Sequence, residues 1–178
     1  MILMKILPFP ELRQAYDWDC GASAIQSILI YYGIDVRAGL IIKEAGTNHD
    51  HGTTPENMKA VFKSYKLKCT SGKITIDEIK DYINKKTPVI LLLQAWTRQE
   101  NVDWKNDWDD GHYVVAIGYD SKRIYFEDPY SLSRTYLSYD DLLLRWHHRD
   151  SNGKKYLNWG LVVTGQRSSA WRKARPMG

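Results

Sequence analysis

The stretch Arg13-Gln14-Ala15-Tyr16-Asp17-Trp18-Asp19-Cys20-Gly21-Ala22 decides the fold expected for this chain, because it places a lone thiol at the start of a long apolar helix. After Cys20, apolar residues recur at spacings of three and four as far as Tyr32, which is typical of a helix buried along one face. Asp19 is a favoured N-cap residue type, so Cys20 is predicted at the first helical position. There the helix dipole stabilises a thiolate by roughly 0.3–1 kcal/mol. The thiolate is the nucleophilic form of cysteine.

The composition is that of a globular domain of 178 residues, 43% hydrophobic and 26% charged, which is long enough to bury a core. No stretch approaches the roughly 18 consecutive apolar residues of a membrane span. The apolar run in 1–8 is too short for a signal peptide. Cys20 and Cys69 are too few for a disulfide framework, so both are predicted to be reduced thiols in a cytoplasmic protein.

The net charge of +4 comes from one end of the chain. Residues 167–178 hold four of the 25 basic residues and no acidic residue, so the remaining 21 basic residues balance the 21 acidic ones. A neutral body offers no footprint for nucleic acid. The short basic tail is predicted to be a solvated terminus.

The order of the predicted elements indicates an α+β fold, with an N-terminal helical lobe packed on a C-terminal, mostly antiparallel sheet. We expect one domain over 1–166, with its helical lobe at about 11–86 and its sheet lobe at about 87–166, followed by the tail 167–178. Ligands commonly bind between such lobes. The predicted helices are 20–33, 37–45, 54–65, 75–86 and 138–147, and the predicted strands are 2–7, 67–70, 88–93, 112–119, 123–128 and 159–164.

Two polar residues stand at the ends of neighbouring predicted strands. His112 begins an apolar strand, and Asp128 ends the next strand before Pro129. A three-residue loop at 120–122 sets Asp128 opposite Val114, where it is a diagonal neighbour of His112. A two-residue turn at 121–122 places Asp128 on the other face. A paired His112 and Asp128 therefore require the odd loop, or a bulge with the same effect.

Each candidate residue has an ordinary structural interpretation when it is taken alone. A lone cysteine is commonly a small core residue, an aspartate before proline is a common turn, and Gln14 is an unremarkable polar residue. The combination is less ordinary: Gln14 lies six residues before Cys20 at a helix start, and His112 and Asp128 follow on successive strands. Together they favour a thiol active site over four unrelated structural positions.

Gln14, the segment 19–22, the segment 111–119 and Asp128 with Pro129 resemble the motifs of papain-like cysteine peptidases. More narrowly, they resemble the bacteriocin-processing, double-glycine leader peptidases and their free-standing bacterial relatives, over about residues 8–165. The resemblance implies a papain-like fold with its site between two lobes. It also implies that Cys20 is the nucleophile, His112 the base, Asp128 its orienting partner and Gln14 the oxyanion donor. The best-known members are fused to a membrane transporter and this sequence has no such segment, so cleavage after a double glycine is not carried over.

These residues predict a thiol hydrolase that cleaves amide bonds of a peptide or protein substrate and needs no cofactor. Two alternatives remain open at this point. An amine could take the acyl group from Cys20 in place of water, which would make the protein an acyl or peptidyl transferase. The same fold could also serve as a peptide-binding module without catalysis.

The loop 97–111 is rich in Asp and Trp, and it immediately precedes His112. If it borders the cleft, its acids favour cationic peptides and its indoles bind apolar side chains or arginine. Trp108, Asp109 and Gly111 are therefore candidate substrate-binding residues. The sequence His49-Asp50-His51 could begin a metal site, but no further ligands are evident, so we predict no metal.

Overall fold

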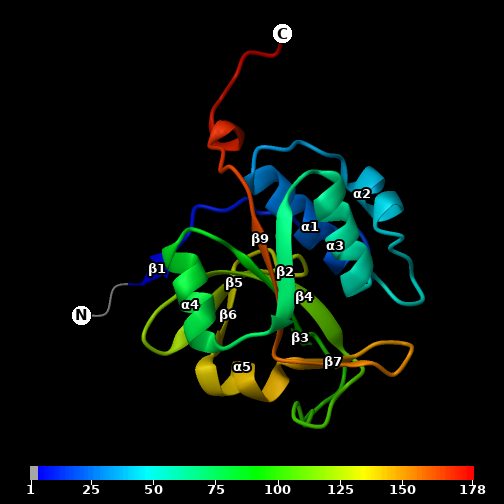
Figure 1. Ribbon diagram of the computed structural model, residues 1–178. Helices are drawn as coiled ribbons and strands as arrows, with labels where there is room; N and C mark the ends of the chain where they lie inside the picture. Colours follow the sequence, from blue (N-terminus) through cyan, green and yellow to red (C-terminus); the bar gives the residue numbers. More distant parts are fainter. Residues whose placement is uncertain (1–3) are drawn as a thin grey trace.

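The computed structural model describes residues 4–178 and has a seven-stranded antiparallel sheet at its centre (Figure 1). The strand order is β2-β9-β3-β4-β5-β6, and β1 pairs with the end of β4. β7 and β8 form a separate hairpin. The strands are β1 (Lys5–Ile6), β2 (Lys68–Lys73), β3 (Val89–Gln94), β4 (Gly111–Tyr119), β5 (Arg123–Glu127), β6 (Thr135–Ser138), β7 (His147–Arg149), β8 (Lys155–Leu157) and β9 (Trp159–Thr164).

The helices contact the sheet in two groups. α1 packs against α2, α3 and β4, whereas α4 packs on β3 and β4, and α5 on β5 and β6. In Figure 1 the first three helices lie together on one side of the molecule. The helices are α1 (Cys20–Tyr31), α2 (Ala38–Glu44), α3 (Pro55–Ser64), α4 (Ile76–Asn84), α5 (Tyr139–Arg145) and the 3₁₀ helix η1 (Ala170–Arg172). The predicted α+β fold is confirmed.

Local capping explains where several helices begin. The Thr54 side chain accepts a hydrogen bond from the backbone of Asn57, with Pro55 at the first position of α3. Thr75 and Glu78 form the reciprocal capping box predicted for α4. α1 begins at Cys20 as predicted, but the Asp19 side chain does not cap it. That carboxylate instead accepts hydrogen bonds from the backbone N–H groups of residues 15 and 16, so it orders the loop before the helix.

Several predicted boundaries differ from the structure, and some elements were not predicted. The helix predicted over 138–147 ends at Arg145, and His147 lies in β7. The cause is Trp146, which is buried and donates its indole N–H to the carbonyl of Trp159 at 2.9 Å, so the chain turns into the core. β6 and the β7–β8 hairpin were not predicted. The strand expected over 2–7 is β1 at Lys5–Ile6, and positions 2 and 3 lie outside the described residues.

The β4–β5 hairpin has a tight two-residue turn and a bulge. The register shifts by one residue at Ile117, after which Val115 lies opposite Glu127. The next position along β5 brings Asp128 to the face of the sheet that carries His112. The bulge therefore has the effect that a three-residue loop would have had.

The core lies between the sheet and α1. All six residues of β3 are buried, as expected for a strand that is covered on both faces. Ile25, Ile28 and Leu29 of α1 are fully buried, and α1 packs on β4. Within residues 4–178, no helix combines the length and apolar character needed to cross a membrane.

Candidate active site

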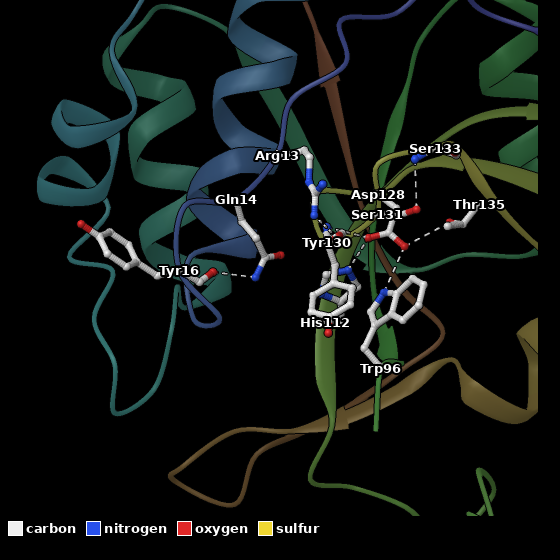
Figure 2. Close-up of polar contacts among 10 residues, drawn as sticks. All are labelled: Arg13, Gln14, Tyr16, Trp96, His112, Asp128, Tyr130, Ser131, Ser133 and Thr135. Carbon is white, nitrogen blue, oxygen red and sulfur yellow. Dashed lines mark hydrogen bonds and ion pairs between the residues drawn. The ribbon is translucent and has the colours of Figure 1, made fainter. Parts of the chain in front are cut away.

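A buried imidazole–carboxylate pair lies where β4 begins and β5 ends. His112 Nε2 is 2.7 Å from Asp128 Oδ1, and both side chains are almost fully buried. The Asp128 carboxylate also accepts hydrogen bonds from the Tyr130 backbone N–H at 3.0 Å, Trp96 Nε1 at 3.1 Å and Thr135 Oγ1 at 3.1 Å (Figure 2). Burial raises the pKa of Asp128, but these donors, His112 foremost, outweigh burial and lower it. Asp128 is thus an ionised carboxylate held by four hydrogen bonds.

His112 is protonated at neutral pH. Burial alone would lower the pKa of His112, but Asp128 and the Cys20 thiol raise it to about 9. Asp128 engages Nε2, which leaves Nδ1 as the ring nitrogen available to Cys20. Cys20 is only partly buried, so its sulfur is open to a ligand in the cleft. The α1 helix and strand β4 therefore bring the thiol to a charged imidazole.

Trp96 holds Asp128 from an unusual backbone conformation. Its φ angle is +62°, in the left-handed region that costs a non-glycine residue roughly 1–2 kcal/mol. This conformation aims the indole N–H at Asp128, and the ring stacks on Tyr130 with centroids 4.6 Å apart. Sequence analysis missed Trp96, because no local pattern links a residue after β3 to a carboxylate 32 positions later.

Gln14 lies on a segment that is tied to the end of β5. Its backbone N–H donates to the Pro129 carbonyl at 2.9 Å, and the Arg13 guanidinium donates to the Tyr130 carbonyl at 3.1 Å. In the side chain, Nε2 donates to the Tyr16 carbonyl at 2.7 Å, while Oε1 is buried without a hydrogen-bond partner among residues 4–178 (Figure 2). A primary amide carries two N–H groups, so one N–H of Gln14 remains for another acceptor.

Glu127 anchors the segment that carries Gln14 at a second point, Leu12. The buried Glu127 carboxyl accepts a hydrogen bond from the Leu12 backbone N–H at 2.9 Å. Burial raises the pKa of Glu127 to about 7, and the charges of Glu11 and Asp128 add to the rise, against the Leu12 N–H and Arg134. Glu127 was not predicted to have a role, because the sequence pattern at the end of this strand, an acid before Pro129, involves its neighbour Asp128.

Cys20 opens into a cleft of about 500 Å³. The three residues predicted to bind substrate, Trp108, Asp109 and Gly111, all line this cleft. Its other walls come from residues 49–55, which precede and begin α3, and from residues 148–152 of the β7–β8 hairpin. The cleft thus runs between the helical side of the molecule and the sheet, where sequence analysis placed the site.

The β7–β8 hairpin supports the Trp108 wall, which is a role that sequence analysis missed. The His147 imidazole donates to the Asp107 carbonyl at 2.6 Å, and its ring lies 4.4 Å from that of Trp108. The next residue of β7, His148, lies so close to Gly111 that a methyl group at Gly111 would collide with the His148 ring.

The remaining sequence candidates lie apart from the His112 pair. Cys69 is a free thiol on β2, opposite Val163. The side chains of His49 and Asp50 are exposed on the cleft rim, 3.5 Å apart. Within residues 4–178, no three His, Cys, Asp or Glu side chains are grouped to hold a metal ion.

Papain-like cysteine peptidases combine a thiol at a helix start with a carboxylate-paired imidazole from an antiparallel sheet, and here the thiol also lines a cleft. The model of the Peptidase_C39 like family matches residues 6–154, which is most of the chain. The chain therefore belongs to the Peptidase_C39 like family and is a papain-like cysteine peptidase. Among curated proteins, no sequence matches it.

Solved structures show the same fold at low sequence identity. A putative C39-like peptidase from Bacillus anthracis aligns with a TM-score of 0.69 at 17% identity, over 93% of this chain and 100% of its own. A double glycine motif protease from an AMS/PCAT transporter, in complex with the leader peptide, aligns at 0.64 and 16%, over 90% and 97%. The peptidase domain of Streptococcus ComA, a bi-functional ABC transporter, aligns at 0.64 and 19%, over 87% and 97%.

Proposed function

We propose that the protein hydrolyses peptide bonds with Cys20 as nucleophile, His112 as acid and base, Asp128 as its orienting partner and Gln14 as an oxyanion donor. The observation that carries this proposal is the buried 2.7 Å contact between His112 and Asp128, beside a partly exposed thiol that helps to keep the imidazole charged. An imidazolium next to a thiol favours the thiolate.

The proposed reaction begins with a thiolate on Cys20 and an imidazolium on His112. The thiolate attacks the scissile carbonyl, and the negative charge moves to the carbonyl oxygen. The Cys20 backbone N–H has no partner within the helix, because the first four N–H groups of a helix are free, and it donates to this oxyanion with the spare N–H of Gln14. His112 protonates the leaving amine, and water then hydrolyses the thioester with His112 as the base.

The walls of the cleft support a peptide substrate with basic or apolar side chains. Among the described residues that line the cleft there are four aspartates, and Arg149 is the only lysine or arginine, so the potential of the cleft is negative. Trp108 and Trp18 provide apolar surface beside them. The lining aspartates are Asp17, Asp50, Asp109 and Asp150.

We also propose a peptide ligand and a cytoplasmic location. One solved relative is described with a leader peptide bound, which supports a peptide ligand for the corresponding cleft here. Both cysteines are free thiols, as is usual in reducing compartments, which supports a cytoplasmic location.

The test is digestion of a peptide library by the natural chain and by variants. Cys20→Ala abolishes cleavage, and Gln14→Ala slows it by about two to three orders of magnitude, because one lost oxyanion donor costs roughly 2.7–4 kcal/mol. Cys69→Ala is the matched control and keeps full activity, since its sulfur lies on β2.

Thiol labelling separates an enzyme from a binding module. Burial raises the pKa of Cys69, so iodoacetamide labels Cys20 faster than Cys69 at neutral pH if the proposed ion pair exists. Unchanged hydrolysis by Cys20→Ala would refute the mechanism. Condensation products formed when amines are added would identify a transferase that uses the same Cys20.

A further inference from the structure

A second cavity, of about 510 Å³, includes the Asp128 carboxyl but not Cys20. We call it the sheet pocket. Its floor is the apolar face of β3 to β6, with Leu93, Val114, Phe126 and Leu137. Its volume falls within the range of about 300–1,000 Å³ that is typical of small-molecule sites, and its apolar lining is equally typical.

One cation in the sheet pocket, Arg145, makes no ion pair among the described residues, although the charge of Asp141 acts on it from beyond ion-pair distance. The Arg145 guanidinium stacks over the Trp104 ring, 4.0 Å from its centroid. Within residues 4–178, its Nε is buried without a hydrogen-bond partner, and no carboxylate lies within ion-pair distance of it. By contrast, the second arginine in the lining, Arg134, pairs with Glu11 at 3.3 Å.

A guanidinium that stacks on an indole keeps its N–H groups free, because they point outward in the plane of the guanidinium. There they match the two oxygens of a carboxylate. A buried donor without a partner is unfavourable, and a bound carboxylate would supply the missing acceptor. The apolar floor beside Arg145 excludes a ligand that is polar throughout and favours one with a hydrocarbon body.

We propose that the sheet pocket binds an apolar carboxylic acid, an aromatic or branched hydrocarbon group with a single carboxylate, which pairs with Arg145. Such a group occurs as a free acid and as the last residue of a peptide. The site is separate from the Cys20 cleft and does not depend on the proposed hydrolysis.

A ligand in the sheet pocket contacts residues that donate hydrogen bonds to Asp128, the partner of His112. Trp96 and Thr135 both line the pocket, and both donate to Asp128 Oδ2. Within residues 4–178, the Asp128 carboxylate pairs with His112 and lies beyond ion-pair distance of Arg145, so it does not take the place of the ligand's carboxylate there. A bound ligand therefore acts on the His112–Asp128 pair through Trp96 and Thr135, the two donors that hold the Asp128 carboxylate in place.

The experiment is a titration of the ¹⁵N-labelled natural chain, followed through its tryptophan indole N–H signals. The probes are 3-phenylpropionate and the tripeptide Ala-Ala-Phe with a free carboxyl, each compared with its uncharged amide. We expect saturable shifts at Trp96 and Trp104 with both acids, and at least tenfold weaker binding of both amides. Trp171, outside the sheet pocket, is the internal control and does not shift.

Variants then test whether Arg145 pairs with the carboxylate of the ligand. Arg145→Gln weakens binding of the acids at least tenfold, whereas Arg172→Gln, the same change on the exposed η1 helix, leaves it unaltered. Tighter binding of the tripeptide than of 3-phenylpropionate identifies a peptide terminus as the natural ligand, and the reverse identifies a free acid. Equal binding of acid and amide, shifts confined to other tryptophans, or no saturable shift overturns the proposal. The comparison of acid with amide needs no variant, and none of these measurements requires turnover.

Discussion

Two carboxyl groups that are adjacent in the chain have opposite protonation behaviour. Asp128 shares a hydrogen bond with the charged His112, and its pKa is lowered, whereas burial raises the pKa of Glu127 to about 7. Successive residues of a strand point to opposite faces, so each carboxyl has its own surroundings. One of them holds the imidazole, and the other holds the Leu12 N–H of the segment that carries Gln14.

The raised pKa of His112 is directly measurable. In the natural chain, we expect the ring signals of His112 to titrate with a midpoint of about 9, because Asp128 and Cys20 favour the charged ring. In Asp128→Asn the midpoint falls, since the amide carries no charge to stabilise the imidazolium. Activity that needs the protonated ring is lost as pH rises through this midpoint, so its alkaline limb moves to lower pH in the variant. NMR titration checks the midpoint, and an unmoved midpoint in Asp128→Asn would exclude Asp128 as its cause.

Glu127 makes stability depend on pH in the sense opposite to an ordinary carboxylate. Its folded pKa of about 7 lies above the usual 4.5, so the folded state holds an extra proton between these values, and stability falls as pH rises through them. Relative to Glu127→Gln, the natural chain loses up to about 3 kcal/mol of unfolding free energy between pH 4.5 and 8.

Urea unfolding of both chains at the two pH values measures this loss. Glutamine keeps the acceptor for the Leu12 N–H, so the comparison isolates the charge of Glu127. Glu100→Gln, on an exposed loop, is the control and follows the natural chain. A difference that stays constant with pH would contradict the raised pKa of Glu127.

At the scale of elements, the sequence predicted where helices begin more accurately than where they end. Thr54 and Thr75 cap helices through contacts three residues away, so their patterns are local and readable. The end of α5 depends on Trp146, which reaches a carbonyl on β9, and the bulge at Ile117 depends on pairing across a hairpin. Sequence periodicity does not reveal such distant partners. The helix predicted over 138–147 is therefore too long, and the sequence leaves the bulge as one of two options.

The start of β4 is fitted against β7 so closely that the two strands are coupled. A methyl group at Gly111 would collide with the His148 ring. Gly111→Ala therefore lowers the free energy of unfolding by about 1–3 kcal/mol, the usual cost of overpacking. Adding His148→Ala removes the obstructing ring, so the double variant recovers most of this loss.

Denaturant unfolding of the natural chain, both single variants and the double variant gives the coupling energy. Neighbours in contact are non-additive, so the double variant is more stable than the sum of the two single effects implies. Strict additivity would show that the two residues do not touch.

At the scale of the whole molecule, the α+β class followed from the order of helices and strands, but the strand order did not. β1 joins β4, and β2 pairs with β9 at the edge of the sheet. These pairings connect residues about a hundred positions apart, and one-dimensional patterns carry no record of them. Sequence alone therefore predicted the kind of layers but not their assembly.

The tail 167–178 supports α1 from the end opposite to Cys20. The Ser168 backbone N–H donates to the Tyr31 carbonyl, and Trp171 is half-buried nearby. The twelve residues of α1 span about 18 Å, so truncation after Gln166 lowers the melting temperature by a few degrees and leaves the alkylation rate of Cys20 unchanged. Thermal unfolding and timed labelling check the two halves of this prediction, and slower labelling would show that the tail acts on the site.

The position of β9 has a consequence for how the protein is made. Residues 159–164 lie in the sheet between β2 and β3, so β9 is synthesised after both of its neighbours and joins them in one layer. Until the ribosome has released it, β2 and β3 have no common neighbour, and the layer that carries His112 is incomplete. The sheet that carries His112 is therefore complete only once residues 159–164 have been synthesised.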